Sequence, residues 1–298
     1  MKKITLAVAV IALCSFSLAQ DPEPAAVRSF GLARNHEAAT SREHSEKGAI
    51  AQQYAAASLR DFATSTCSFT FSSGSKNTFL KYCVTANGNI AQLETPAGAE
   101  NIAVGAVGEG YGICDLQNPA SPTAYNDFAD FGDSGNWGVT AVLNQDARSV
   151  KLARTTRDGI WTLTQTFTQL PGTSPSARIV MALRNNTAVT RQVLLLRYVD
   201  VDAAGLTINN LDATLNSAFG WNSISSNTVP SGLILQDLGT TSFLHLGLVQ
   251  STFSPPDTCN VRVNEAPVLS TDGSLVMAYL NNVAKSQTMV VTLAYKGL

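Results

Sequence analysis

Ser134 lies in the segment FGDSGNWG (131–138), and a serine in such a setting can act as a nucleophile when a base removes its proton. That base would be a histidine oriented by an acid. The chain has three histidines: His36 and His44 lie in a polar N-terminal stretch, and His245 lies on an expected strand, SFLHLGLVQ. None of these contexts places a base beside Ser134. We therefore predict that Ser134 is a loop residue, because Gly, Asp and Ser are common in loops.

The GDSG core is also the nucleophile motif of the trypsin-like serine proteases. That family continues with another glycine and usually a proline, whereas this chain continues with Asn136 and Trp137. None of the three histidines lies in the TAAHC context that the family uses. These departures argue against protease chemistry.

The same loop, NDFADFGDSGN, gathers side chains that could bind a cation: Asn126, Asp127, Asp130, Asp133 and Asn136. Oxygen ligands of this kind suit calcium. The aspartates recur every third residue, whereas an EF-hand loop places its ligands at alternate positions. Asp127, Asp130 and Asp133 are the candidate calcium ligands, and the alternative is a solvated acidic loop. No other cofactor is indicated.

A second carboxylate pair is formed by Asp200 and Asp202, which share one strand face with Tyr198 in RQVLLLRYVDVD. Paired carboxylates can act as general acid and base in glycoside hydrolysis. The alternative is a solvated strand end.

Aromatic side chains could provide a surface for a sugar ring. Trp137 stands beside the glycine-rich loop and close to Tyr125, so these two residues are the candidate ligand-binding pair. The alternative is that Trp137 begins the WGVTAVL strand and packs into the core. Trp161 and Trp221 alternate with other apolar residues, and we expect both in the core, where large aromatic side chains bury much area.

The N-terminus has the pattern of a signal peptide, which we assign to residues 1–19. Lys2 and Lys3 precede an apolar run (4–16), and Ser17-Leu18-Ala19 offers the small residues of a cleavage site. The run is shorter than the roughly 20 residues that span a bilayer. Cys14 would suit a lipoprotein only if the residue before it were small, but that residue is Leu13, so we favour a plain secretory signal. We expect a secreted, extracellular or periplasmic protein without membrane insertion.

Composition narrows the choice of partners. Only 14% of the residues are charged and the formal net charge is −2. A nucleic-acid-binding protein would show a basic patch or stripe, and the sequence has none. It also lacks the Lys/Arg cluster that anionic membranes attract. The surface is expected to be neutral and polar, and to suit a glycan or an extracellular protein.

Four cysteines remain after removal of the signal peptide, an even number that predicts two disulfides in an oxidising compartment. Cys67 and Cys83 flank the turn residues 72–76 almost symmetrically, so a hairpin would join them. By elimination Cys114 pairs with Cys259. A zinc site is the alternative, but the spacing lacks any CxxC pair.

The remaining pattern predicts an all-β fold. After a polar spacer with a weak helix (20–62), period-two strands and turn signals continue through residues 63–298, which we assign to a single domain. The unbroken apolar run at 193–196 predicts a strand covered on both faces, with the second cover supplied by a loop, an extra sheet or a partner subunit. We expect a large antiparallel β-sandwich of two packed sheets.

The stretch from Thr85 to Asp202, with ETPAGAENI and LRNNTAVTRQVLLLRYVDVD, resembles the large β-sandwiches of the galactose-mutarotase-like class in its strand rhythm. The resemblance implies a fold of the supersandwich type. That class uses histidines together with a carboxylate for sugar chemistry, and this chain lacks histidines in the corresponding strands. The resemblance therefore implies the fold and no activity.

These observations favour a secreted, non-catalytic β-sandwich that acts as a binding or structural module, with a neutral glycan as its ligand. One alternative is a carbohydrate-active enzyme of hydrolase or epimerase type, with acidic residues at the mouth of the sandwich. The other is a protein–protein interaction module, including a homo-oligomer.

Overall fold

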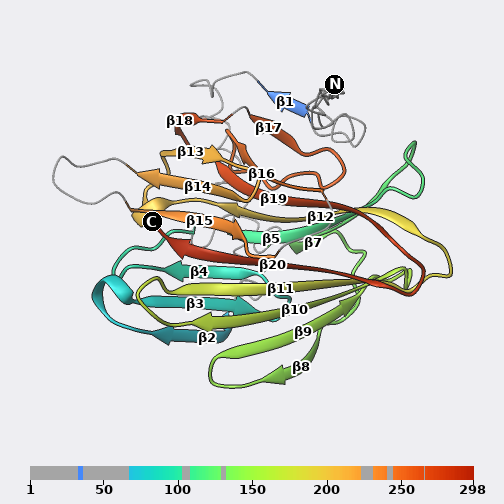
Figure 1. Ribbon diagram of the computed structural model, residues 1–298, viewed down its shortest axis with the longest axis horizontal. Helices are drawn as coiled ribbons and strands as arrows, with labels where there is room; N and C mark the ends of the chain where they lie inside the picture. Colours follow the sequence, from blue (N-terminus) through green and yellow to red (C-terminus); the bar gives the residue numbers. More distant parts are fainter. Residues whose placement is uncertain are drawn as a thin grey trace, which may run out of the picture.

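The computed structural model of the chain describes residues 33–35, 67–102, 108–128, 132–222, 231–239, 244–264 and 266–298 (Figure 1). The predicted signal peptide and the helix expected within 43–62 lie outside the described residues. The described residues form strands and two short 3₁₀ turns, η1 (Lys76–Thr78) and η3 (Ala203–Gly205), with no α-helix among them. The fold is all-β, as the sequence predicts.

One layer is built on an eight-stranded sheet. Its pairs are antiparallel except for β1, which lies parallel to β17 and comes from the stretch assigned to the spacer. In spatial order its strands are β1 (Ala33–Asn35), β17 (Arg262–Asn264), β16 (Leu244–Gln250), β19 (Ser274–Val283), β12 (Arg191–Asp200), β5 (Glu109–Asp115), β6 (Thr123–Phe128) and β7 (Gly132–Asp133).

The facing layer is a nine-stranded antiparallel sheet. Its order is β18 (Val268–Thr271), β13 (Asn209–Ala213), β14 (Ser217–Asn222), β15 (Ser231–Asp237), β20 (Thr288–Gly297), β11 (Ser176–Asn185), β10 (Trp161–Leu170), β9 (Ser149–Thr155) and β8 (Ala141–Gln145). Figure 1 shows β20 crossing the middle of the molecule, between β15 and β11.

A three-stranded sheet completes the sandwich. Its order is β2 (Cys67–Ser73), β3 (Leu80–Thr85) and β4 (Ile90–Glu94). Gly88 has a φ of 89° in the tight turn between β3 and β4, a conformation that favours glycine, and it follows Asn87 in an Asn-Gly pair typical of such hairpin turns. The apolar side chains of the three strands join the main core.

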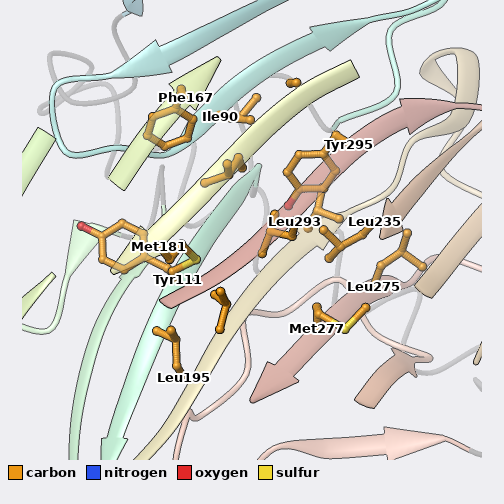
Figure 2. Packing of buried hydrophobic residues seen from close by; sticks show 14 of the residues in the cluster. Ile90, Tyr111, Phe167, Met181, Leu195, Leu235, Leu275, Met277, Leu293 and Tyr295 are labelled. Atoms are coloured by element: carbon orange, nitrogen blue, oxygen red, sulfur yellow. The ribbon is translucent and has the colours of Figure 1, made fainter. Parts of the chain in front are cut away.

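The main core lies between the layers, and period-two alternation explains why. Leu195 on β12 and Met277 on β19 meet Met181 on β11 and Leu293 on β20, while Ile90 enters from the three-stranded sheet (Figure 2). Successive strand residues point to opposite faces, so each of these strands gives alternate side chains to the core. The sandwich expected from the pattern is confirmed.

A second, smaller core covers the outer face of the eight-stranded sheet. Leu194 and Leu196 point to this face and pack with Phe253 and Val261 from the loop at residues 251–261. The hydroxyl of Tyr198 donates to the carbonyl of Phe253. The run at 193–196 is therefore covered on both faces, and the second cover is a loop of the same chain.

Both predicted disulfides are present. Cys67 and Cys83 join β2 to β3 with their Cα atoms 5.4 Å apart. Cys114 on β5 joins Cys259 in the covering loop, across a sequence separation of 145 residues. The second bridge thus attaches the loop to the sheet that it covers. The pairing is typical of an oxidising environment.

Candidate functional site

The outer face of the nine-stranded sheet, the face turned away from the core, carries an aromatic pair on β14. Alternation along SAFGWN points Ala218 and Gly220 inward and Phe219 and Trp221 outward. The inner positions must be small: a Cβ at Gly220 would lie 2.9 Å from Leu211 Cδ2 and 3.0 Å from Val201 Cγ1. The large rings are therefore placed outside. The expectation that Trp221 lies in the core is wrong.

The two rings are stacked against each other. Their centroids are 5.9 Å apart, the ring planes are inclined by 29°, and both side chains are partly exposed. In register, Asp212 and Ile234 flank Phe219, while Asn210 and Gly232 flank Trp221. Gly232 has no side chain of its own, and the position that its Cβ would take lies 2.4 Å from Leu298 Cδ1, so the side chain of Leu298 covers Trp221 on the side toward β15. Aromatic rings with polar groups around them are typical of sites that bind small polar ligands.

Trp137 and Tyr125 do not form the exposed surface that the sequence suggests. They are 2% and 1% exposed, and their ring centroids lie 6.3 Å apart. The Arg154 guanidinium carbon lies 5.1 Å from the Trp137 ring centroid, and the Tyr125 hydroxyl donates to Asp158 Oδ2 at 2.5 Å. Both rings are packed inside the fold, which agrees with the alternative for Trp137. Trp161 is fully buried, as expected.

The predicted calcium ligands do not form a described site, because Asp127 is buried in an ion pair. Asp127 is 1% exposed on β6, and its carboxylate forms an ion pair with Arg154 on β9. Asp130 lies outside the described residues. Asp133 is described only through its backbone on β7, which pairs with that of Asp127 on β6. Calcium binding in this loop stays a prediction, and the ion pair gives Asp127 another role.

Ser134 is held by the backbone of β6. Its amide donates to the Asn126 carbonyl at 2.8 Å, and its Oγ accepts from the Asn126 amide at 3.1 Å. His245 lies on β16, four strand spacings from β6, which is about 19 Å. The one histidine in the described part of the chain is too far away to activate this hydroxyl.

A three-carboxylate cluster involves the predicted pair. Asp200 and Asp202 meet Asp272, with one oxygen from each lying within 4.8 Å of the others. Asp272 stands where the chain passes from β18 to β19, and the Val201 amide donates to the carbonyl of Gly273 at 3.3 Å. Burial and the charge of Asp200 raise the pKa of Tyr198 well above its usual value, so its hydroxyl remains a donor. Oxygens arranged in this way could hold a hard cation such as calcium.

A polar cluster of Tyr279, Asp237 and His245 connects the two large sheets. The Tyr279 hydroxyl on β19 donates to Asp237 Oδ1 at the end of β15, at 3.0 Å. His245 Nε2 lies 2.7 Å from Asn216 Oδ1 and 4.0 Å from Asp237 Oδ2. Burial raises the pKa of Asp237, while Tyr279 and His245 act in the opposite direction. These contacts link the sheets at one end of the sandwich.

Comparison of the sequence with protein-family models and with curated proteins gives no match. Among solved structures, the chain is similar to a bacterial glucoamylase in complex with acarbose, at 10% identity and a TM-score of 0.47. The match covers 78% of this chain and 32% of the glucoamylase chain, so this chain spans about a third of that length. A likeness at this level carries no functional argument. Within the described residues, no helix has the length and apolarity needed to cross a membrane.

Proposed function

We propose that the protein is a secreted, non-catalytic glycan-binding β-sandwich whose binding surface is the outer face of the nine-stranded sheet around Phe219 and Trp221. The observation that carries the proposal is this aromatic pair, with near-parallel rings on one strand face and both side chains partly exposed. The negative face of an aromatic ring attracts the C–H groups on one side of a sugar ring. The amide and carboxylate of Asn210 and Asp212 stand in register to bind hydroxyl groups.

The proposal favours binding over hydrolysis. A retaining glycosidase separates its two carboxyl groups by about 5–5.5 Å and an inverting one by about 6.5–9.5 Å. The oxygens of Asp200, Asp202 and Asp272 lie within 4.8 Å of one another, and Asp200 is 1% exposed. Such a buried group of three carboxylates suits a bound cation better than a sugar placed between two carboxylates.

The structure offers another explanation for the apolar strand β12, for which the sequence predicts a second cover from a loop, an extra sheet or a partner subunit. The second cover of that strand is the loop at 251–261, so the unbroken apolar run calls for no second chain. Size-exclusion chromatography with light scattering gives the oligomeric state directly. A stable dimer would revive the protein–protein alternative.

Affinity electrophoresis and calorimetry with a panel of soluble polysaccharides test the proposal. We expect Trp221→Ala to weaken glycan binding at least tenfold, which corresponds to about 1.4 kcal/mol. The matched control is Val290→Ala, another outward and partly exposed apolar residue of the same sheet, which should bind as the wild type does. Melting curves check that both variants fold. Absence of binding to every polysaccharide, or equal binding by Trp221→Ala, would overturn the proposal.

A further inference from the structure

The outer face of the nine-stranded sheet has an unequal distribution of charge. Its strands place one carboxylate on this face, that of Asp212 on β13, next to the edge strand β18. Against this stand four cations, whereas the whole chain has a formal net charge of −2. The cations are Lys151 on β9, Arg178 and Arg184 on β11, and Lys296 on β20.

Two of these cations lie on β20 and β11, two and three strands away from the aromatic pair on β14. Phe219 is in register with Ile234, and Ile234 with Lys296, so Lys296 lies two strands away, at about 10 Å. Arg178 opposes Ala294, two residues before Lys296 on β20, and is therefore its diagonal neighbour. An oligosaccharide with one sugar on the rings can reach both cations.

A glutamine completes this group. Lys296 Nζ donates to Gln236 Oε1 at 2.8 Å, and Gln236 opposes Ala294 from the other side. Ala294 is fully buried although it points outward, so the longer side chains around it cover it. Lysine and arginine stems cover apolar surface in this way while their charged ends stay accessible.

The two cations have no acidic partner among the described residues. The ion pairs there involve Arg154, Arg191, Arg197 and His245. Arg178 Nε is buried and has no hydrogen-bond acceptor in the described part of the chain. A buried N–H without an acceptor is costly. Nε itself has no accessible surface, so an anionic ligand could approach only the exposed part of Arg178, which as a residue is partly buried.

We propose that the ligand is an acidic glycan, in which the carboxylate or sulfate of one sugar binds Arg178 and Lys296 while a neighbouring sugar ring packs on Phe219 and Trp221. This inference rests on the proposed function and replaces the neutral glycan expected from composition. Arginine binds a planar carboxylate through two parallel N–H donors, and lysine adds a point charge. Charge complementarity therefore selects the class of ligand, and the aromatic pair packs against the sugar ring whatever its charge.

Binding to four polymers tests the inference: polygalacturonate, its methyl ester, dextran sulfate and dextran. We expect the wild type to bind polygalacturonate or dextran sulfate at least tenfold more tightly than the matched uncharged polymer, and the pair that shows the preference identifies the anion. The double variant Arg178→Gln/Lys296→Gln should lose this preference while keeping its affinity for the uncharged polymer. Added salt should weaken wild-type binding to the acidic polymer more than that of the double variant.

The matched control is Lys151→Gln/Arg184→Gln, which removes the same charge from the same face away from the rings. It should retain most of the preference, and an equal loss in this control would indicate nonspecific attraction and overturn the inference. Trp221→Ala should weaken binding to acidic and uncharged polymers alike. If the wild type binds uncharged glycans through Trp221 without any acidic preference, this inference fails and the proposed function stands. If it binds no polymer, both fail.

Discussion

Arg197 and Glu109 form an ion pair that is completely buried between the layers of the sandwich. Both side chains are 0% exposed, and Arg197 Nη2 lies 2.7 Å from Glu109 Oε2. Gln165 on β10 accepts from Arg197, and Tyr295 on β20 donates to Glu109 at 2.9 Å. The amide of Ile90 also donates to Glu109, at 2.6 Å. This polar group therefore connects all three sheets.

Removing one partner of this pair should be more damaging than removing both. Arg197→Met leaves the Glu109 carboxylate buried without its cation, and we expect a loss of about 3–5 kcal/mol in the free energy of unfolding. Arg197→Met/Glu109→Gln should recover part of that loss, because it removes the unpaired charge. Denaturant unfolding of the two variants measures the difference. A double variant less stable than Arg197→Met would contradict this explanation.

Asp127 should contribute to stability through Arg154 and independently of calcium. Asp127→Asn removes the carboxylate that pairs with the buried Arg154, so we expect the same drop in melting temperature in millimolar calcium and in chelator. Melting curves of wild type and variant in both solutions measure this. A drop that occurs only in calcium would make Asp127 a metal ligand, as the sequence pattern suggests.

Asp237 should make the protein less stable as the pH rises. Burial raises its pKa in the folded state, so the folded chain holds this proton more tightly than the unfolded chain. The free energy of unfolding then falls from about pH 4, near the ordinary aspartate pKa, up to the raised value. Asp237→Asn keeps an oxygen acceptor for Tyr279 and cannot ionise.

Unfolding measured across this pH range compares the two proteins. The variant should gain stability relative to the wild type with each step upward in pH and level off above the folded-state pKa. A stability difference that does not change with pH would show that this carboxyl titrates normally.

The bridge between Cys114 and Cys259 should be worth more than that between Cys67 and Cys83. The loops that they close span 145 and 16 residues, and in the chain-entropy model loops of about 100 and 15 residues contribute about 4.7 and 3 kcal/mol. Replacing both cysteines of the long-range bridge by alanine should also release the 251–261 loop and increase binding of a hydrophobic dye.

The Cys67→Ala/Cys83→Ala variant is the control for this comparison, since its bridge lies in a hairpin away from the covering loop. It should be less destabilised and should bind no additional dye. Equal dye binding by both variants would mean that the long-range bridge has no special role in holding the loop.

Alternation predicts which residues share a strand face but leaves open which face meets the core. In RDGIWTLTQTFTQL one face is threonine, so Trp161 is assigned correctly from the sequence. In SAFGWN both faces are apolar, and the small residues Ala218 and Gly220 face inward because Leu211 and Val201 already fill the space. That restriction comes from other strands and leaves no mark on β14 itself, apart from the alternation of small and large residues.

Contacts between distant segments account for the other differences. Asp272 lies 70 positions after Asp202 in the numbering, and only the passage from β18 to β19 brings them together. Arg154 neutralises Asp127 because β9 faces β6 across the sandwich, which the local loop pattern could not indicate. The cysteine pairing could be predicted because four cysteines leave few arrangements, and the hairpin between Cys67 and Cys83 fixes the second pair by elimination.

The central position of β20 has a consequence for how the chain acquires its fold. Strand β20 joins β15 to β11, so the nine-stranded sheet consists of two blocks that touch through a strand synthesised after every other strand of the sheet. During vectorial synthesis neither block can close on the other until β20 has emerged. Such non-local pairing is slow, and the nascent chain stays open while it waits. The nine-stranded sheet can therefore close only after β20 has been made, and its two blocks remain unjoined until then.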